Sequence, residues 1–189
     1  MTRDEILEAA AQIFREKGFH AASMQDIALA VNLQKASLYH HVSSKQEILL
    51  ALLDRALDLL IEHMEQVISQ PLSSEEKLRQ AMRVYLTVML GNRDLAAVLL
   101  LEHRSLEPQY QARHTPRRDR FERLWRDLIK DGHDQGSFSC TDPALASRFV
   151  LGVLNWSITW YRPDGPLSPP EIADQFAEMF LKGLLVRKS

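Results

Sequence analysis

The residues best suited to recognition chemistry lie between Ser23 and Glu47, in the segment SMQDIALAVNLQKASLYHHVSSKQE. From Ile27 to Gln46 the segment contains no Asp or Glu, so its polar surface can approach phosphate groups without like-charge repulsion. Amide, hydroxyl and cationic side chains are the types that hydrogen-bond to base edges and phosphates. The residues expected to contact DNA are Ser23, Gln25, Gln34, Lys35, Ala36, Ser37, Tyr39, His40 and Lys45.

Two short helices around a tight turn are expected to hold these side chains. Ser23 is a suitable N-cap for the first helix, with Asp26 at its third position, and an apolar stripe at helical spacing follows. Asn32 then breaks the helix, because Asn tolerates the positive φ that a sharp helix–helix turn requires. The pattern favours a helix-turn-helix DNA reader, and its alternative is an ordinary helical hairpin with a solvated polar side.

A long helix is expected to begin directly after this segment. Ser44 and Glu47 have the spacing of a capping box, and apolar residues then recur at helical spacing until Gln70-Pro71. The first amides of a helix carry partial positive charge, and Lys45 adds a full one. We therefore expect this helix start to bind a DNA phosphate.

These features give the N-terminal part of the chain a resemblance to the TetR-type transcriptional repressors. The matching elements are Gly18-Phe19 after a first helix, the helix from Ser23 to Val31, the run LQKASLYHH from Leu33 to His41, and Ser44-Lys45 before a long helix. The family usually has Gly where Asn32 stands and an aromatic residue where Val42 stands. Asn32 keeps the turn chemistry, and Val42 only trims a core contact.

The resemblance implies an all-α fold of two domains. Residues 1–47 would form the helix-turn-helix DNA-binding domain, and residues 48–189 a helical ligand-binding and dimerisation domain. TetR-type repressors bind palindromic operators as dimers that pair through their last two helices, and a small hydrophobic inducer releases them. In this chain those two helices carry broad apolar stripes that include Phe149 and Phe180. Core packing produces similar stripes, so the pattern alone leaves interface and core open.

The segment from Asn155 to Pro169, NWSITWYRPDGPLSP, resembles the C-terminal domain of TetR-type repressors of fatty-acid and sterol-ring degradation, which respond to acyl-CoA thioesters. An acyl-CoA needs an apolar wall for its chain and cations for its phosphates. The residues expected to contact such a ligand are Met82, Tyr85, Met89, His103, Arg104, Phe121, Leu124, Trp125, Leu128, Asn155, Trp156 and Trp160.

Two parts of this ligand hypothesis have simpler alternatives. Trp156 and Trp160, four residues apart on one helical face, are also what a core wedge looks like. Four arginines before the helix around Phe121 are candidates for the phosphates, and a solvated charged surface is the alternative. They are Arg113, Arg117, Arg118 and Arg120.

Composition supports a small regulator. The chain has 189 residues, of which 46% are hydrophobic, enough to bury a sizeable core. Its net charge of −2 and pI of about 6.4 argue against nucleic-acid binding by bulk basicity. The longest apolar run, Leu95 to Leu101, is too short for a membrane span. With one cysteine, Cys140, and no signal peptide, a cytoplasmic location without a membrane partner is expected.

No spacing typical of a metal or catalytic site is found. The seven His do not form His-x-x-x-His or Glu-x-x-His pairs, and Gly-rich phosphate loops and nucleophile elbows are absent from the sequence. We expect neither enzyme activity nor a cofactor, with acyl-CoA acting only as an effector. Two alternative functions remain: a multidrug-sensing TetR-type repressor, and a non-DNA all-helical protein-interaction module.

Overall fold

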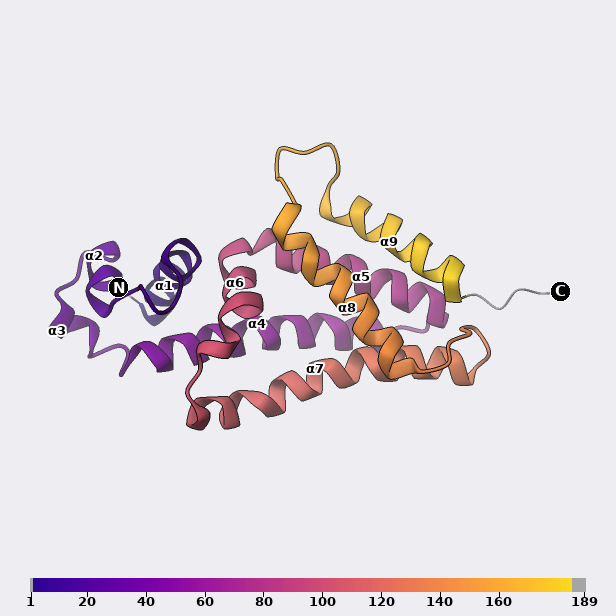
Figure 1. The fold of residues 1–189 in the computed structure, drawn as a ribbon, viewed down its shortest axis with the longest axis horizontal. Helices are drawn as coiled ribbons and strands as arrows, with labels where there is room; N and C mark the ends of the chain where they lie inside the picture. The colour runs from indigo at the N-terminus through magenta and orange to yellow at the C-terminus, as the bar shows by residue number, and fades with distance from the viewer. Residues whose placement is uncertain (1, 185–189) are drawn as a thin grey trace. The chain divides into compact units, whose positions relative to one another are not determined.

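The computed structural model describes residues 2–184, and within them the chain is all-α, as predicted (Figure 1). The α-helices are α1 (Arg3–Lys17), α2 (Met24–Ala30), α3 (Lys35–Leu38), α4 (Lys45–Ile68), α5 (Ser74–Gly91), α6 (Arg93–Ala97), α7 (Pro108–Asp134), α8 (Pro143–Trp160) and α9 (Pro169–Leu184). A π-helical turn (Val98–Glu102) and a 3₁₀ turn (His103–Ser105) follow α6.

The chain packs into two compact units that interleave along the sequence. Unit 1 contains the described residues up to Asp58 together with Asn92–Arg118, and unit 2 contains Leu59–Gly91 together with the described residues from Asp119 onward. Helices α4 and α7 therefore each contribute residues to both units. The boundary expected between residues 47 and 48 divides the chain by function rather than by packing, and it stays a prediction.

The core of unit 1 joins the helix-turn-helix to the later segment. Ile6 and Phe14 of α1, Ile27 of α2 and Leu38 of α3 are all buried in it. The π-helical turn adds Val98 to the same cluster, and the first half of α4 adds further leucines. Three short helices have too little apolar surface to form a stable core alone, so residues distant in sequence complete it.

Local capping interactions set several helix ends, among them the one that the sequence predicted at Ser23. Thr2 with Glu5 and Ser23 with Asp26 form complete capping boxes at α1 and α2. The Asp142 side chain accepts the Ala144 and Leu145 amides at the start of α8. At α4 only half of the predicted box forms, because the Ser44 hydroxyl accepts the Glu47 amide while the Glu47 carboxylate binds Arg113.

The segment between α5 and Phe121 differs from its sequence prediction. The apolar run that Pro108 ends predicts one short helix from Arg93 to about Leu106, but α6 ends at Ala97 and passes into the π-helical and 3₁₀ turns. The helix around Phe121 is α7, which begins at Pro108 and runs through Pro116, so the arginines expected before this helix lie inside it. A proline at the first helical position is favourable, because its missing amide hydrogen would be unbonded there in any case.

In unit 2, α9 and α8 both pack against α5. Phe149 of α8 stacks on Phe180 of α9, with 5.7 Å between ring centroids, and Trp160 meets the Phe176 ring edge-on. No single described helix is long and apolar enough to span a membrane. One bent pair, Ser74–Gly91 with Arg93–Ser105, meets that test by length and composition only.

Candidate DNA and effector sites

The turn between α2 and α3 has the backbone geometry that a helix-turn-helix requires. Asn32 has φ 54°, the only positive φ at a non-glycine residue in the described part of the chain, as predicted from its amide side chain. The Leu33 amide donates to the Ala28 carbonyl at 2.8 Å, which closes the turn. Helix α3 is short, with four residues, because the amides of His40 and His41 turn back to carbonyls three residues earlier.

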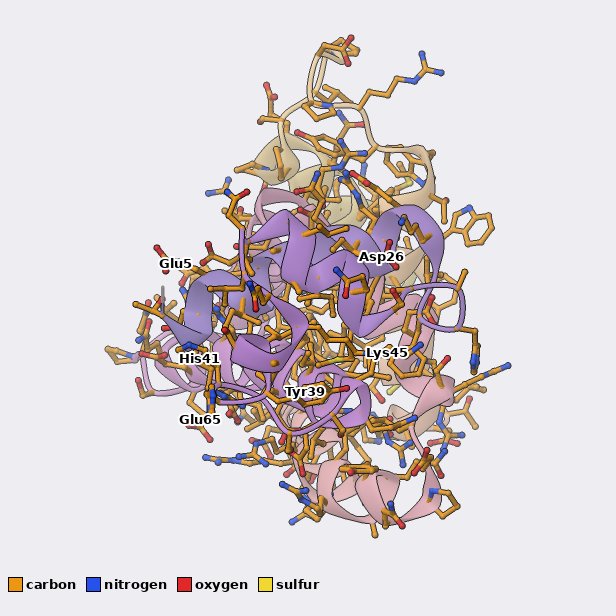
Figure 2. All side chains as sticks on the ribbon, turned by 90° about the vertical axis from the view of Figure 1, so that its left-hand side faces the viewer. Glu5, Asp26, Tyr39, His41, Lys45 and Glu65 are labelled. Carbon is orange, nitrogen blue, oxygen red and sulfur yellow. The ribbon has the colours of Figure 1, made fainter. Side chains whose placement is uncertain are left out.

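Most of the predicted DNA-contact residues are exposed in the segment around this turn, and Figure 2 shows where Tyr39 and Lys45 lie. Tyr39 is 47% exposed, Ser37 is half-buried, and the remaining residues of the set on α2 and α3 are exposed. Leu38 faces the opposite way and is fully buried, so it anchors α3 to the core. The exposed residues are Gln25, Gln34, Lys35, Ala36 and His40.

Asp26 is the one acid at the edge of this surface, and its charge is compensated. Lys17 binds its carboxylate at 2.6 Å, and the Ser23 hydroxyl and amide donate to the other oxygen at 2.6 and 2.8 Å. These bonds hold the pKa of Asp26 far below its usual range, and the bond from Lys17 contributes most. The Ser23 hydroxyl is thus engaged in capping α2, and a DNA contact from it stays a prediction.

Lys45 is bonded to backbone carbonyls of its own chain. Its ammonium donates to the carbonyls of Phe19 and Ala22, both at 2.7 Å, and lies 4.4 Å from the centroid of the Phe19 ring. A weaker third bond reaches the carbonyl of His20 at 3.4 Å. Burial lowers the pKa of Lys45. Because the ammonium is bound by the loop between α1 and α2, we infer that Lys45 positions this loop. The phosphate contact expected from the sequence is the alternative, and the salt dependence of operator binding decides between the two.

Glu102, at the end of the π-helical turn, holds the same loop from the other side. Its Oε1 accepts the Phe19 amide at 3.1 Å, and its Oε2 accepts the Ser105 hydroxyl at 3.0 Å. Gln46 extends the network by donating to the Ser105 carbonyl and accepting the Glu107 amide. The sequence offered no signal for Glu102, because its partner lies 83 positions away.

A buried aromatic cluster occupies unit 2 where the sequence predicted an effector pocket. The Tyr85 ring lies 6.1 Å from Phe121 and 6.0 Å from Trp125, centroid to centroid. Burial raises the pKa of Tyr85, whose hydroxyl donates to Oδ1 of Asn155 on α8. The predicted pocket residues Met82, Met89 and Leu128 are buried in the same unit, and Leu124 is half-buried.

Four predicted ligand residues lie outside this cluster. Trp156 is 66% exposed and Trp160 45% exposed on α8, so neither is part of the buried cluster in the single chain. His103 and Arg104 belong to the 3₁₀ turn of unit 1, where burial and then the Arg104 charge lower the pKa of His103. For all four residues, contact with an effector stays a prediction.

The arginines at the start of α7 are bound to acids of α4. Arg113 contacts Glu47 at 2.7 Å, and Arg117 contacts both Asp54 and Asp58 at 2.9 Å. Arg120 contacts Glu65 at 2.6 Å. These three cations are neutralised by carboxylates and hold two helices together, so they are poor candidates for the phosphates of a nucleotide.

Two grooves among the described residues of unit 2 differ in character. The larger, about 650 Å³, lies between α5 and α9, and its arginines pair with Asp174 and Glu178. The smaller, about 270 Å³, lies between α7 and α8. Its lining is Glu122, Arg126, Ala144, Ser147, Arg148, Leu151, Gly152 and Asn155. Among the described residues, no cluster of His, Cys, Asp and Glu could hold a metal ion.

Known protein families match both the N-terminal and the C-terminal part of the chain. The family description "Bacterial regulatory proteins, tetR family" matches residues 6–52, and "Tetracyclin repressor-like, C-terminal domain" matches residues 71–184. A helix-turn-helix regulator with a helical C-terminal domain is thereby defined. The chain belongs to the TetR family of transcriptional regulators.

Three relatives are similar over nearly their whole length. The transcriptional repressor KstR2 of Mycolicibacterium smegmatis is 29% identical over 185 residues, covering 96% of this chain and 90% of that protein. The crystal structure of PfmR from Thermus thermophilus has a TM-score of 0.87 at 39% identity, covering 94% and 97% of the two chains. AibR, solved with isovaleryl coenzyme A and operator DNA, has a TM-score of 0.86 at 30% identity, covering 94% and 96%. The protein is a ligand-responsive transcriptional repressor of this family.

Proposed function

We propose that this repressor binds a palindromic operator as a homodimer and that an acyl-CoA thioester releases it. The reading surface around α3 supports the DNA part, because its exposed residues carry hydrogen-bonding groups and Lys35 without a nearby uncompensated acid. A four-residue helix can make few base contacts, so a single helix-turn-helix would bind DNA weakly. A dimer has two helix-turn-helix motifs, which contact two half-sites of the operator.

The exposed apolar stripe of α8 supports the homodimer. Leu145, Phe149 and Trp156 are each more than 60% exposed, and on α9 Met179 is 66% exposed. Large apolar side chains gathered on one surface are typical of an interaction site in a protein that is otherwise polar outside. A second copy of the same two helices offers a matching surface, as a two-fold dimer requires.

The buried cluster around Tyr85 carries the effector proposal. It combines aromatic rings, two methionines and a polar Tyr85–Asn155 pair inside an apolar bundle, which suits a ligand with an apolar part and a polar junction. AibR, similar over most of its length, binds isovaleryl coenzyme A. An acyl-CoA effector for this chain agrees with both observations.

The effector is tested by titrating the protein–operator complex, with the operator selected from a library of random duplexes. We expect medium- and long-chain acyl-CoAs to dissociate the complex, and free CoA and free fatty acids at equal concentration to leave it intact. Linkage requires the operator to weaken acyl-CoA binding by the same factor. Release by lipophilic cationic drugs instead would place the protein among multidrug sensors, and no release by any compound would overturn an acyl-CoA effector.

A further inference from the structure

Trp125 has a buried hydrogen-bond donor without an acceptor. Its side chain is 0% exposed, and its Nε1–H has no partner among the described residues. Indole Nε1–H groups usually find an acceptor when buried, since leaving one unbonded is unfavourable. Tyr85 and Phe121 surround the indole ring, and the Tyr85 hydroxyl is already committed to Asn155. An acceptor carried by a ligand would satisfy the Trp125 donor.

The groove between α7 and α8 adjoins this cluster through a shared residue. Asn155 lines the groove and also accepts the Tyr85 hydroxyl. Arg126 of α7 and Arg148 of α8 line the same groove, and both are exposed. Unlike the paired arginines at the start of α7, neither makes an ion pair with any described residue. Glu122 is the only acid in the lining, so the groove carries a net positive charge.

We propose that the groove and the Trp125 cluster form one effector site with a fixed polarity. Trp125 Nε1–H donates to the carbonyl oxygen of the thioester, and Arg126 and Arg148 bind the phosphates of the nucleotide. The Asn155 amide and the Ser147 hydroxyl line the groove beside a pantetheine arm, whose two amides need polar neighbours. The inference rests on the acyl-CoA effector proposed above and adds which residues read which part of the ligand.

The carbonyl contact is tested by removing either partner of the hydrogen bond. Trp125→Phe keeps an aromatic ring and removes the donor, and an S-alkyl-CoA thioether keeps the chain and removes the carbonyl. We expect Trp125→Phe to weaken acyl-CoA binding about tenfold by calorimetry, the effect of one buried hydrogen bond, and to leave thioether binding within about twofold. Equal losses for both ligands, or no loss for either, would overturn the contact.

A measurement on the unaltered protein keeps this test valid if the Phe variant folds poorly. In protein labelled with ¹⁵N at its three indoles, the Nε1–H resonance that remains in both Trp156→Phe and Trp160→Phe belongs to Trp125, and neither replacement disturbs a fully buried side chain. We expect acyl-CoA to move this resonance downfield, as a new hydrogen bond does, and the thioether of equal chain length to move it less. Identical shifts with both ligands would contradict a bond to the carbonyl.

The phosphate contact is tested with Arg126→Gln and Arg148→Gln, and Arg123→Gln serves as the control because Arg123 is an exposed α7 arginine outside the groove. We expect each groove variant to bind acyl-CoA at least about fivefold more weakly, with a smaller salt dependence. Binding of acyl-pantetheine, which lacks the nucleotide, should not change. Losses equal to that of Arg123→Gln, or equal for both ligands, would overturn the assignment.

The two proposals fail in different ways. If the wild-type protein binds acyl-CoA and releases its operator while all three variants bind it normally, the site is wrong and the proposed effector stands. If the wild-type protein binds no acyl-CoA, the effector proposal fails and the assignment of these residues fails with it.

Discussion

Lys45 carries a positive charge at the edge of the reading surface, yet its ammonium is bonded to carbonyls of the loop between α1 and α2. Each of these charge-assisted bonds replaces water at a partly buried group, so their loss weakens the loop rather than a phosphate contact. Glu102 holds the same loop at the Phe19 amide. Gly18, with φ 77°, precedes Phe19 in a conformation that residues with side chains rarely adopt, so its positive φ favours glycine at this turn.

Lys45→Met should therefore lower stability and leave the salt slope of operator binding unchanged. Methionine keeps the long apolar stem and removes the ammonium, at a cost of about 2 kcal/mol in the free energy of unfolding. Lys35→Met is the matched control, since exposed Lys35 faces the proposed groove-reading side. It should lower the salt slope by about 1 per subunit without changing Tm. Similarly lowered salt slopes for both variants would show that Lys45 contacts a DNA phosphate.

Three carboxylates that take part in helix N-terminal caps lead to the prediction that the fold is less stable at low pH. Hydrogen bonds from Lys17 and Ser23 depress the pKa of Asp26, and those from the Ser73 and Ser168 side chains and amides depress the pKa of Glu76 and Glu171. A depressed pKa stabilises the fold at pH values above the unfolded pKa, near about 4, and this stability disappears as pH falls toward the folded pKa.

We expect Tm to be constant from about pH 7 to about 5 and to fall below about pH 4.5. Asp26→Asn should lower Tm at neutral pH, because the Lys17 ion pair is lost, and should make the fall in acid shallower. Thermal melts followed by circular dichroism between about pH 7 and about pH 3 provide the measurement. An equally steep fall in the Asn variant would mean that Asp26 contributes little to the pH dependence.

At the scale of elements, the sequence predicted helices well where their signals are local. The Ser23–Asp26 box and the Asn32 turn each depend on residues within a few positions of one another, and both form. The sequence did not indicate contacts between residues that are far apart in the chain. Lys45 is engaged by carbonyls 23 to 26 positions away. The α7 arginines were predicted before the helix, and they lie inside it, paired with α4.

The candidate effector site was predicted only in part for a related reason. Tyr85, Phe121 and Trp125 were identified because buried aromatic residues leave a clear helical pattern. The same pattern cannot distinguish an inward face from an outward face that a second chain would cover, so Trp156 was assigned to the pocket. Arg126 and Arg148 were missed because exposed arginines are common, and only the groove groups them.

The outer face of α8 leads to a prediction about assembly. Trp156→Glu should give a folded monomer, because Trp156 is largely exposed in the single chain and its loss leaves the core intact. An unpaired carboxylate in a dry dimer interface costs several kcal/mol. Light scattering should show half the mass of the wild-type protein, and operator affinity should fall at least about a hundredfold. Arg123→Glu is the control for added charge, and a dimeric Trp156→Glu would exclude this face as the interface.

At the scale of the whole molecule, each compact unit is built from stretches that are separated in the sequence. Unit 1 needs two separate stretches of sequence, since the π-helical turn supplies Val98 to the core and Leu106 joins it further on. Chain leaving unit 2 at Gly91 returns to unit 1 at Asn92. The chain also crosses between the units within α4, at Asp58 and Leu59, and within α7, at Arg118 and Asp119. The segment 92–118 is therefore covalently joined to unit 2 at both ends while it completes the core of unit 1.

The interleaved core predicts that the DNA-binding unit does not fold from its N-terminal stretch alone. A fragment of residues 1–58 would expose the surfaces of α1 and α4 that Val98 and Leu106 cover, and it would lack the Glu102 carboxylate at Phe19. A domain of this size is marginally stable even with an intact core. We expect this fragment to show no cooperative melt by circular dichroism. Residues 1–58 joined by a flexible linker to residues 92–118 should regain a cooperative melt.

A cooperative transition in the fragment 1–58, at a Tm near that of the linked version, would show instead that the helix-turn-helix folds without the later segment. In that case the first 58 residues would contain a complete folding unit.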